Sequence, residues 1–240
     1  MTKKAFITGA SRGIGKAIAL RLAKDGFDII GICRSGLASL EETRKGVEAC
    51  GRSFRGAAFD IANRSETTEK LTELFGDSAP DAVIYNAGIT RDNMFVFMTP
   101  EEWDSVMRTN LDGFYNVVQP LLFAMIARRS GRIIAITSAS GQSGQAGQVN
   151  YAASKAALAA AVKSLAREVG RKGILVNAVA PGVIETDMTA KLPLDQILPM
   201  IPVKRMGRPE EIAGVVSFLC SEDSTYVHGQ IIAANGGLIT

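Results

Sequence analysis

Seven short apolar runs alternate with longer stretches of helical period, and this alternation is the feature that most limits how the chain can fold. The runs are residues 4–8, 28–33, 53–59, 81–85, 132–138, 174–180 and 230–235. Helical patterns lie between them, for example over residues 14–26 and 151–170. Strands that are apolar on both faces and separated by helices are typical of a parallel sheet wrapped on two sides by right-handed crossovers. The sequence therefore predicts an α/β protein with a doubly wound parallel sheet.

One domain is predicted to span residues 1–240, because no linker, low-complexity tract or fixed repeat divides the chain. An apolar fraction of 47% is sufficient for one large core. The least regular region is residues 181–208, which precede a helix that we expect to begin at Pro209. We interpret this region as a lid, since prolines interrupt its helical pattern. These prolines are Pro181, Pro193, Pro199 and Pro202.

Composition argues against several classes of protein. A net charge of +3, from 27 Lys and Arg against 24 Asp and Glu, provides no strong basic field for nucleic acid. Cys33, Cys50 and Cys220 are widely spaced and lack Cys or His companions, so we expect neither disulfides nor a metal site. A reducing cytoplasm fits this cysteine usage. We also expect no signal peptide and no membrane association, since no apolar run reaches the roughly 18–20 residues that a membrane span requires.

A glycine-rich turn over residues 8–15, TGASRGIG, follows the first predicted strand and leads into a helix. Glycines permit a tight reversal, and the free amides at a helix start attract phosphate. On the first strand-to-helix turn of a doubly wound sheet, this arrangement predicts a dinucleotide site. A plain tight turn is the alternative, because the spacing differs from the commonest glycine fingerprint. The candidate contacts in the turn are Gly9, Ser11, Arg12, Gly13, Ile14 and Gly15.

The end of the second predicted strand favours NADP(H) over NAD. An NAD site usually places an acidic residue there, about 20 residues beyond the glycines. This chain has Cys33, Arg34 and Ser35 instead, while Asp28 is at the other end of the strand. We expect Arg34 and Arg12 to bind the 2′-phosphate through charge-assisted hydrogen bonds. The alternative is that both arginines are solvated surface charges.

Tyr151 and Lys155 are four residues apart at the start of a predicted helix, so their side chains share one face. A free tyrosine has a pKa near ~10, and a neighbouring ammonium lowers it toward working pH. We therefore predict that the pair forms a general acid. Ser138, at the predicted carboxyl end of the fifth strand, is placed to hydrogen-bond a substrate oxygen. Packing is the alternative for a single tyrosine, but the combination with Ser138 and the glycine turn favours catalysis.

The chain resembles the short-chain dehydrogenase/reductase family over essentially its whole length. The motifs occur in the expected order: TGASRGIG (8–15), NAG (86–88), Asn110, Ser138, YAASK (151–155) and PG (181–182) followed by Thr186. The resemblance implies a single-domain, Rossmann-type sheet of seven strands with helices on both faces. It also implies a catalytic tetrad in which Tyr151 donates the proton, Ser138 orients the carbonyl and Lys155 holds the nicotinamide ribose. Asn110 is expected to keep a helix distorted around a water molecule.

The same resemblance implies further NADP(H) contacts. Asp60 and Ile61 are expected beside the adenine, and residues near the carboxamide follow the sixth strand. The NAG motif is expected to support the central strand and the ribose. These further candidate residues are Asp60, Ile61, Asn86, Ala87, Gly88, Pro181, Gly182, Ile184 and Thr186, together with Tyr151 and Lys155.

Within the family, the chain most resembles the 3-oxoacyl-[acyl-carrier-protein] reductases of fatty-acid synthesis. Segments such as NAGITRDN (86–93) and the residues 147–158 carry this likeness. Two departures stand out: Tyr85 occupies a position where asparagine is usual, and Phe95 and Phe97 replace aliphatic and basic residues. The aromatic loop suits an aryl or conjugated acyl chain, as in polyketide or aryl polyene assembly, or packs on a neighbouring subunit. Gln148 is a further candidate substrate contact.

The resemblance implies two partners, an acyl carrier protein and further copies of this chain in a homotetramer. Carrier proteins are acidic, and two basic pairs end predicted helices: Arg128 with Arg129, and Arg171 with Lys172. Favourable interaction with the helix dipole explains these pairs equally well. We expect the single histidine, His228, to have a structural role.

These observations lead to one principal hypothesis, which is NADPH-dependent reduction of a 3-oxoacyl thioester to the 3-hydroxyacyl product. Two alternatives remain open at this point. One is a carbonyl reductase or alcohol dehydrogenase of the same fold that acts on a free small molecule. The other is a regulator that senses NADP(H) without turnover, although sensing does not need a tuned phenol.

Overall fold

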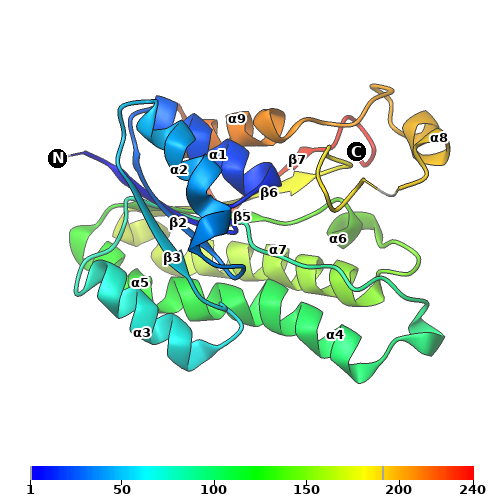
Figure 1. Cartoon of the computed structure of the whole chain (residues 1–240), viewed down its shortest axis with the longest axis horizontal. Coiled ribbons are helices and arrows are strands. Elements are labelled where there is room, and N and C mark those ends of the chain that lie inside the picture. Colours follow the sequence, from blue (N-terminus) through cyan, green and yellow to red (C-terminus); the bar gives the residue numbers. More distant parts are fainter. Residues whose placement is uncertain (1, 191) are drawn as a thin grey trace.

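The predicted doubly wound sheet is confirmed. The computed structural model, which describes residues 2–190 and 192–240, contains seven parallel strands in the order β3-β2-β1-β4-β5-β6-β7 (Figure 1). Each strand lies within two residues of its predicted limits. The strands are β1 Lys4–Thr8, β2 Asp28–Cys33, β3 Phe54–Ala58, β4 Ala82–Tyr85, β5 Gly131–Ile136, β6 Ile174–Pro181 and β7 Ile231–Ala234.

Helices cover both faces of the sheet, as Figure 1 shows. Helices α1, α2 and α9 pack on one face, and α3, α5 and α7 pack on the other. Helix α4 packs against α7. The helices are α1 Gly13–Lys24, α2 Glu41–Glu48, α3 Arg64–Phe75, α4 Pro100–Met107, α5 Gly113–Arg128, α6 Ser140–Ser143, α7 Val149–Val169, α8 Leu194–Ile197 and α9 Pro209–Cys220.

The central strands supply both halves of the core. Along β1, Ala5 and Ile7 belong to the cluster beneath α1 and α9, whereas Phe6 belongs to the cluster beneath α5 and α7. All three side chains are fully buried. Successive residues of a strand point to opposite faces, so a strand covered on both sides must be apolar at every position. This is why the runs appear in the sequence without polar alternation.

Two element limits differ from the sequence prediction in ways that affect the site. Strand β5 ends at Ile136, and Ser138 lies just beyond it, where the chain turns into α6. The backbone still follows β6 there, because the Thr137 amide donates to the Val179 carbonyl at 2.8 Å. Helix α7 begins at Val149, so Tyr151 lies inside its first turn.

The region interpreted as a lid, residues 181–208, has little regular structure. It contains α8 and a 3-10 turn over Leu198–Met200, and a single bridge joins Ile184 to Gly207. Lys191 of this segment lies outside the described residues. Its role as a lid remains a prediction. Across the described part of the chain, none of the helices combines the length and apolar character that crossing a bilayer requires.

Candidate active site

The sequence-predicted residues gather at the carboxyl edge of the sheet. The glycine turn follows β1, the NAG residues 86–88 follow β4, Ser138 follows β5 and Gly182 follows β6. The chain runs from β1 to β2 and β3 on one side of β1 and then returns to β4 on the other side. Such a switch point leaves a crevice between strand ends, and it is the usual ligand site of an open α/β sheet.

The glycine turn is held in place by the NAG residues. The Thr8 hydroxyl accepts hydrogen bonds from the amides of Asn86 and Ala87, both at 3.0 Å. The Asn86 side chain donates in return to the carbonyls of Thr8 at 3.0 Å and Gly9 at 3.2 Å. A Cβ on Gly15 would collide with the Gly9 carbonyl and lie 2.5 Å from the Asn86 side-chain nitrogen. The turn therefore packs too tightly for any residue but glycine at this position.

The start of α1 fits a phosphate group. Its first turn contains no acidic residue, and Gly13 begins the helix with a φ of 53°, which is a left-handed conformation. Arg12 at the N-cap position directs its guanidinium to Asp187 at 3.0 Å instead of capping the helix. The first amides of α1 are thus free of a side-chain cap and lie at the positive end of the helix dipole.

Of the two arginines that we predicted for the 2′-phosphate, Arg12 lies within this turn and Arg34 lies beyond the end of β2. Arg34 follows the end of β2 and is 3.8 Å from Asp60, and Arg12 pairs with Asp187 as described above. Both guanidinium groups are mostly exposed to solvent. Asp28 lies at the start of β2, where it accepts from the Ser53 amide at 3.0 Å. The position of Asp28 at the opposite edge agrees with the sequence interpretation.

Tyr151 and Lys155 project from the first turns of α7. The Lys155 ammonium is 5.7 Å from the centre of the Tyr151 ring and donates to the Ile136 carbonyl at 2.8 Å. The Lys155 side chain is only 3% exposed, and burial lowers the pKa of its ammonium to about 8. The Lys155 ammonium is therefore shielded from solvent and loses its proton more readily than an exposed lysine does.

The pKa of the Tyr151 phenol is raised in this structure, whereas the sequence interpretation expected Lys155 to lower it. Burial is the largest influence, and it raises the pKa of the phenol above its ordinary value. Ser138 interacts with the phenol and lowers its pKa, whereas Asp92 raises it. Removing a phenol from water disfavours the charged phenolate, and here that effect exceeds the others. The phenol is consequently protonated at neutral pH.

Asn110 lies in a wide, π-helical turn over Arg108–Asp112 and is fully buried. Its side-chain nitrogen donates to the Ile89 carbonyl and the Ser154 hydroxyl, both at 3.0 Å. Its side-chain oxygen accepts from the Ile89 amide at 2.9 Å. A Cβ on Gly88 would lie 3.2 Å from the Lys155 nitrogen and 3.3 Å from the Asn110 oxygen. Gly88, Asn110 and Lys155 therefore converge on one spot.

Two polar residues that sequence reasoning missed hold the start of α7. Asn150 is fully buried, donates to the carbonyls of Arg91 at 2.9 Å and Glu102 at 3.0 Å, and accepts from the Tyr151 amide at 2.7 Å. Ser154 accepts from Asn110 and donates to the Tyr151 carbonyl at 2.7 Å. The sequence did contain one indication of this role, since Asn150 and Ser154 are uncharged polar residues on the buried side of an alanine-rich helix.

A loop over residues 91–99 borders the polar tract that precedes α7. The Asn93 amide donates to the Gly147 carbonyl at 2.9 Å, and Gln148 donates to Asp92 at 2.8 Å. Phe95 and Phe97 lie in a 3-10 turn of this loop and are 64% and 71% exposed. We call residues Met94–Phe97 of this loop the aromatic turn. It lies beside the active-site tract but presents its rings to solvent.

The four basic residues considered for carrier docking lie at the opposite edge of the sheet. They lie two or three residues before β5 and β6, at the amino ends of the strands, whereas Ser138 and Gly182 follow the carboxyl ends. Arg128 donates to the carbonyls of Ala79 and Pro80, both at 2.8 Å, and Arg129 donates to that of Arg171 at 3.1 Å. Within one chain, these residues are therefore not brought to the site.

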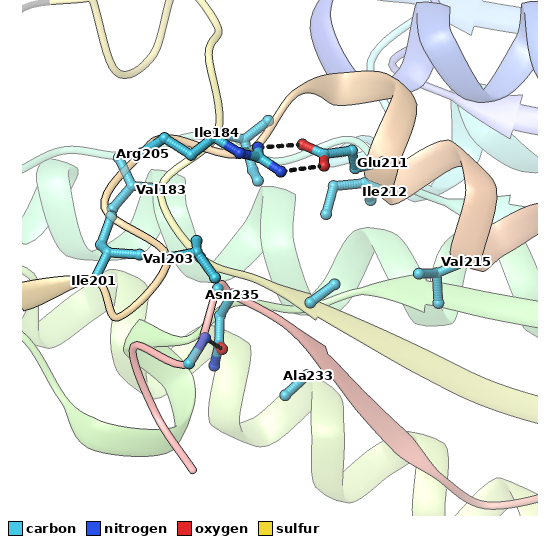
Figure 2. Close-up of a pocket in the computed structure, with 15 residues that line it drawn as sticks. Val183, Ile184, Ile201, Val203, Arg205, Glu211, Ile212, Val215, Ala233 and Asn235 are labelled. Carbon is cyan, nitrogen blue, oxygen red and sulfur yellow. Dashed lines mark hydrogen bonds and ion pairs between the residues drawn. The ribbon is translucent and has the colours of Figure 1, made fainter. Parts of the chain in front are cut away.

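A cavity of about 400 Å³ lies between the 181–208 region, α9 and β7 (Figure 2). Gly182 and Ile184, two of the predicted carboxamide contacts, line it, and the Arg205–Glu211 ion pair at 2.7 Å crosses its rim. Ser138, Tyr151 and Lys155 do not belong to its lining. The chemistry is therefore located by the converging side chains and not by this cavity. The described ranges, 2–190 and 192–240, contain no group of three His, Cys, Asp or Glu residues that could hold a metal ion.

Comparison with known proteins gives full-length matches. A family model described as enoyl-(acyl carrier protein) reductase matches residues 9–239. A 3-oxoacyl-[acyl-carrier-protein] reductase of Aggregatibacter actinomycetemcomitans is 52% identical over 99% of this chain and 100% of its own length. Proteins of the same name from Pseudomonas aeruginosa and Escherichia coli K12 are 45% and 44% identical, each over 98% of this chain and 97% of its own length. These matches agree with the sheet and with the motifs along its carboxyl edge, and the chain therefore belongs to the short-chain dehydrogenase/reductase family.

Proposed function

We propose that this protein reduces the ketone of a 3-oxoacyl thioester, carried on acyl carrier protein, to the 3-hydroxyacyl product with NADPH. The observation that carries the proposal is the convergence of Ser138, Tyr151 and Lys155 beside the glycine turn. The full-length relatives named 3-oxoacyl-[acyl-carrier-protein] reductase support this substrate class.

The site residues support a division of roles. NADPH, when bound, supplies the hydride. Tyr151 donates a proton to the ketone oxygen, since its raised pKa keeps the phenol protonated. Ser138 donates a hydrogen bond to the same oxygen as negative charge develops on it. The Lys155 ammonium stabilises the phenolate that Tyr151 becomes.

NADP(H) contacts follow from the same geometry. We assign the pyrophosphate to the uncapped start of α1 and to the turn that contains Gly9, Ser11, Gly13, Ile14 and Gly15. The 2′-phosphate is assigned to the two mostly exposed guanidinium groups, Arg12 and Arg34, which exchange their carboxylate partners for it.

The remaining NADP(H) contacts are assigned by their strand ends. Asp60 and Ile61 follow β3 on the adenine side. Asn86, Ala87 and Gly88 follow β4 on the ribose side. The carboxamide contacts lie at or after the end of β6 and are Pro181, Gly182, Ile184 and Thr186.

We propose a homotetramer built through two different faces. One face contains Tyr115 and Phe123 of α5, which are 52% and 82% exposed. The second contains Phe218 of α9 and Tyr226 before β7, which are 40% and 102% exposed. Two independent two-fold contacts generate a closed tetramer, and large exposed apolar side chains mark such contacts. Sedimentation of wild type against Phe123→Ser tests the first face, since the variant should form a smaller species.

The tetramer would also give the basic residues a role in carrier docking. Helix α7, with its 21 residues, is roughly 32 Å long, which separates Arg171 and Lys172 from Tyr151 of the same chain. An antiparallel two-fold contact through α5 and α7 would place these basic residues near the partner's carboxyl edge. Charge reversal at Arg171 and Lys172 should then raise the KM for a carrier-bound substrate and leave that for a small thioester unchanged.

We further propose that the aromatic turn contacts the acyl chain. The turn is joined to the active-site tract through the Asn93–Gly147 and Gln148–Asp92 hydrogen bonds, and its exposed rings can stack on a conjugated chain. Contact with a neighbouring subunit is the alternative outcome.

One assay separates the candidate reactions. NADPH absorbance is followed with acetoacetyl-carrier protein, with free ketones, with a crotonyl thioester and without substrate. Oxidation with the first substrate only is expected. Turnover of the crotonyl thioester instead would point to enoyl reduction, and turnover of none would support a sensor.

The proposed acid has a matched control. Tyr151→Phe should lower kcat by about a thousandfold or more, since it removes the only proposed proton donor. Tyr226→Phe removes the hydroxyl of a tyrosine that is fully exposed in the single chain, keeps the apolar ring of the second proposed face, and should leave kcat unchanged. Full activity of Tyr151→Phe would refute the assignment.

A further inference from the structure

Tyr85 is the last residue of β4, directly before Asn86, and none of its surface is exposed. A buried tyrosine needs a partner for its hydroxyl, because an unpaired polar group in the core is costly. The Tyr85 hydroxyl donates to the Thr109 carbonyl at 2.5 Å. Its ring packs edge-on against Phe114, with 5.5 Å between the ring centres. The side chain thus connects the central sheet to the wide turn that contains Asn110.

The wide turn explains why this carbonyl is available. In a regular α-helix, the Gly113 amide would donate to the Thr109 carbonyl, four residues earlier. Here the Gly113 amide donates to the Arg108 carbonyl, five residues earlier. The Thr109 carbonyl therefore does not accept from the Gly113 amide, and the Tyr85 hydroxyl donates to it instead. A hydroxyl from outside the helix then favours the wide turn over a regular one.

Gly113 completes the arrangement from the helix side. A Cβ at this position would lie 2.5 Å from the Tyr85 hydroxyl oxygen and 3.0 Å from Ile61. Any larger residue would push the hydroxyl away from the Thr109 carbonyl. The tyrosine and the glycine are consequently a matched pair, although β4 and α5 are separated in sequence.

The wide turn determines where Asn110 points. Asn110 is the next residue after Thr109, and its side chain joins Ile89 to Ser154 through three hydrogen bonds. Ser154 in turn donates to the backbone carbonyl of Tyr151. A change at the Thr109 carbonyl would therefore be transmitted through Asn110 to the first turn of α7.

We propose that Tyr85 is a positioning residue that holds the π-helical turn over Arg108–Asp112 through the Thr109 carbonyl and thereby orients Asn110. The kinetic consequence rests on the proposed reduction, but the structural consequence does not. Among the described residues, no hydrogen bond joins Tyr85 to Ser138, Tyr151 or Lys155, so Tyr85 acts through Asn110.

The first test is hydrogen–deuterium exchange of the full-length Tyr85→Phe variant, which loses the hydroxyl and keeps the ring. Amides of residues 108–114 should exchange about tenfold faster than in wild type, and those of residues 219–227 should not change. Ser224→Ala is the matched control, since Ser224 is also fully buried and donates to a backbone carbonyl, that of Leu219, at 3.0 Å. It should give the reverse pattern. Unchanged exchange over residues 108–114 in Tyr85→Phe would overturn the proposal, whether or not the protein turns over thioesters.

The second test is kinetic. Tyr85→Phe should lower kcat about tenfold and leave the KM for NADPH within about twofold, whereas Ser224→Ala should change neither. In an Asn110→Ala background, the same substitution should cost less than about twofold, because the positioned group is already absent. Equal losses in both backgrounds would show that Tyr85 does not act through Asn110.

A third variant keeps the proposal testable if the kinetic effects are small. Gly113→Ala should lower the melting temperature, and adding Tyr85→Phe should restore part of the loss, since the collision with the hydroxyl is removed. Additive losses would contradict the matched-pair geometry.

Discussion

Replacing Lys155 with methionine should reduce turnover while leaving the fold as stable as before, or more stable. The ammonium is 5.7 Å from the centre of the Tyr151 ring. At an effective dielectric constant of ~20, a full charge on the phenolate would gain about 3 kcal/mol from it. The charge is only partly developed in the transition state, so the expected loss in kcat is roughly 10- to 100-fold.

The stability side of this prediction follows from burial. Burial lowers the pKa of Lys155 from 10.5 to about 8, so the unfolded chain holds this proton more tightly than the folded one. The shift corresponds to about 3 kcal/mol of destabilisation, which is fully present below pH ~8 and disappears as the pH rises toward ~10.5. Lys155→Met removes this penalty at neutral pH but leaves the Ile136 carbonyl unpaired, at a cost of about 1–3 kcal/mol.

The assay combines urea unfolding at pH 7 with NADPH oxidation over a pH series. Lys163→Met, an exposed position on the same helix, is the matched control and should leave both quantities unchanged. In wild type, kcat/KM should fall as the pH rises through about 8 and the ammonium is lost, and this limb should be missing in Lys155→Met. A variant with kcat within twofold of wild type, or one destabilised by more than about 3 kcal/mol, would refute this reasoning.

Three further predictions concern the cofactor, the start of α7 and the acyl chain. Substituting Arg34 with alanine should raise the KM for NADPH about 10- to 100-fold and change the KM for NADH less than about twofold. Arg167→Ala is the control. Parallel changes in KM for both cofactors would exclude a contact between Arg34 and the 2′-phosphate. Asn150→Ala leaves two carbonyls unpaired and should lower the free energy of unfolding by about 2–3 kcal/mol in urea, so a loss below about 0.5 kcal/mol would contradict the hydrogen bonds described. Substitution of Phe95 and Phe97 with serine should lower kcat/KM about tenfold more for an aryl 3-oxoacyl carrier than for an acetoacetyl carrier. Equal losses of kcat/KM for both substrates, together with dissociation of the oligomer, would identify a subunit contact instead.

The sheet and the edge that carries the site were predictable because each rests on a local rule. A strand buried on both faces cannot alternate polar and apolar residues, and this made the inner strands β2, β1, β4, β5 and β6 visible, whereas the edge strands β3 and β7 are partly exposed. The glycine turn and the i, i+4 spacing of Tyr151 and Lys155 are likewise local. The position of the basic residues at the far edge could also be predicted from the sequence, since Arg129 and Lys172 lie two or three residues before predicted strands.

The rest depends on contacts between distant segments. The pKa of Tyr151 reflects burial by several elements, which spacing along α7 does not reveal. Asn150 gains its role only because the carbonyls of Arg91 and Glu102 are brought to it. The π-helical turn leaves no mark in the hydrophobic period, and it becomes intelligible only when the Tyr85 hydroxyl is seen at the Thr109 carbonyl.

The bond between the Asn86 amide and the Thr8 hydroxyl joins residues 78 positions apart. When a nascent chain has left the ribosome only as far as β3, it contains the whole glycine turn. It still lacks Asn86 and Ala87, whose hydrogen bonds hold the turn in place. Competence to bind a dinucleotide should therefore arise late in synthesis, after β4 has inserted beside β1. Because ligand binding stabilises only the closed form, the cell's own nucleotide pool would then act on the chain as a folding ligand once this long-range pairing is complete.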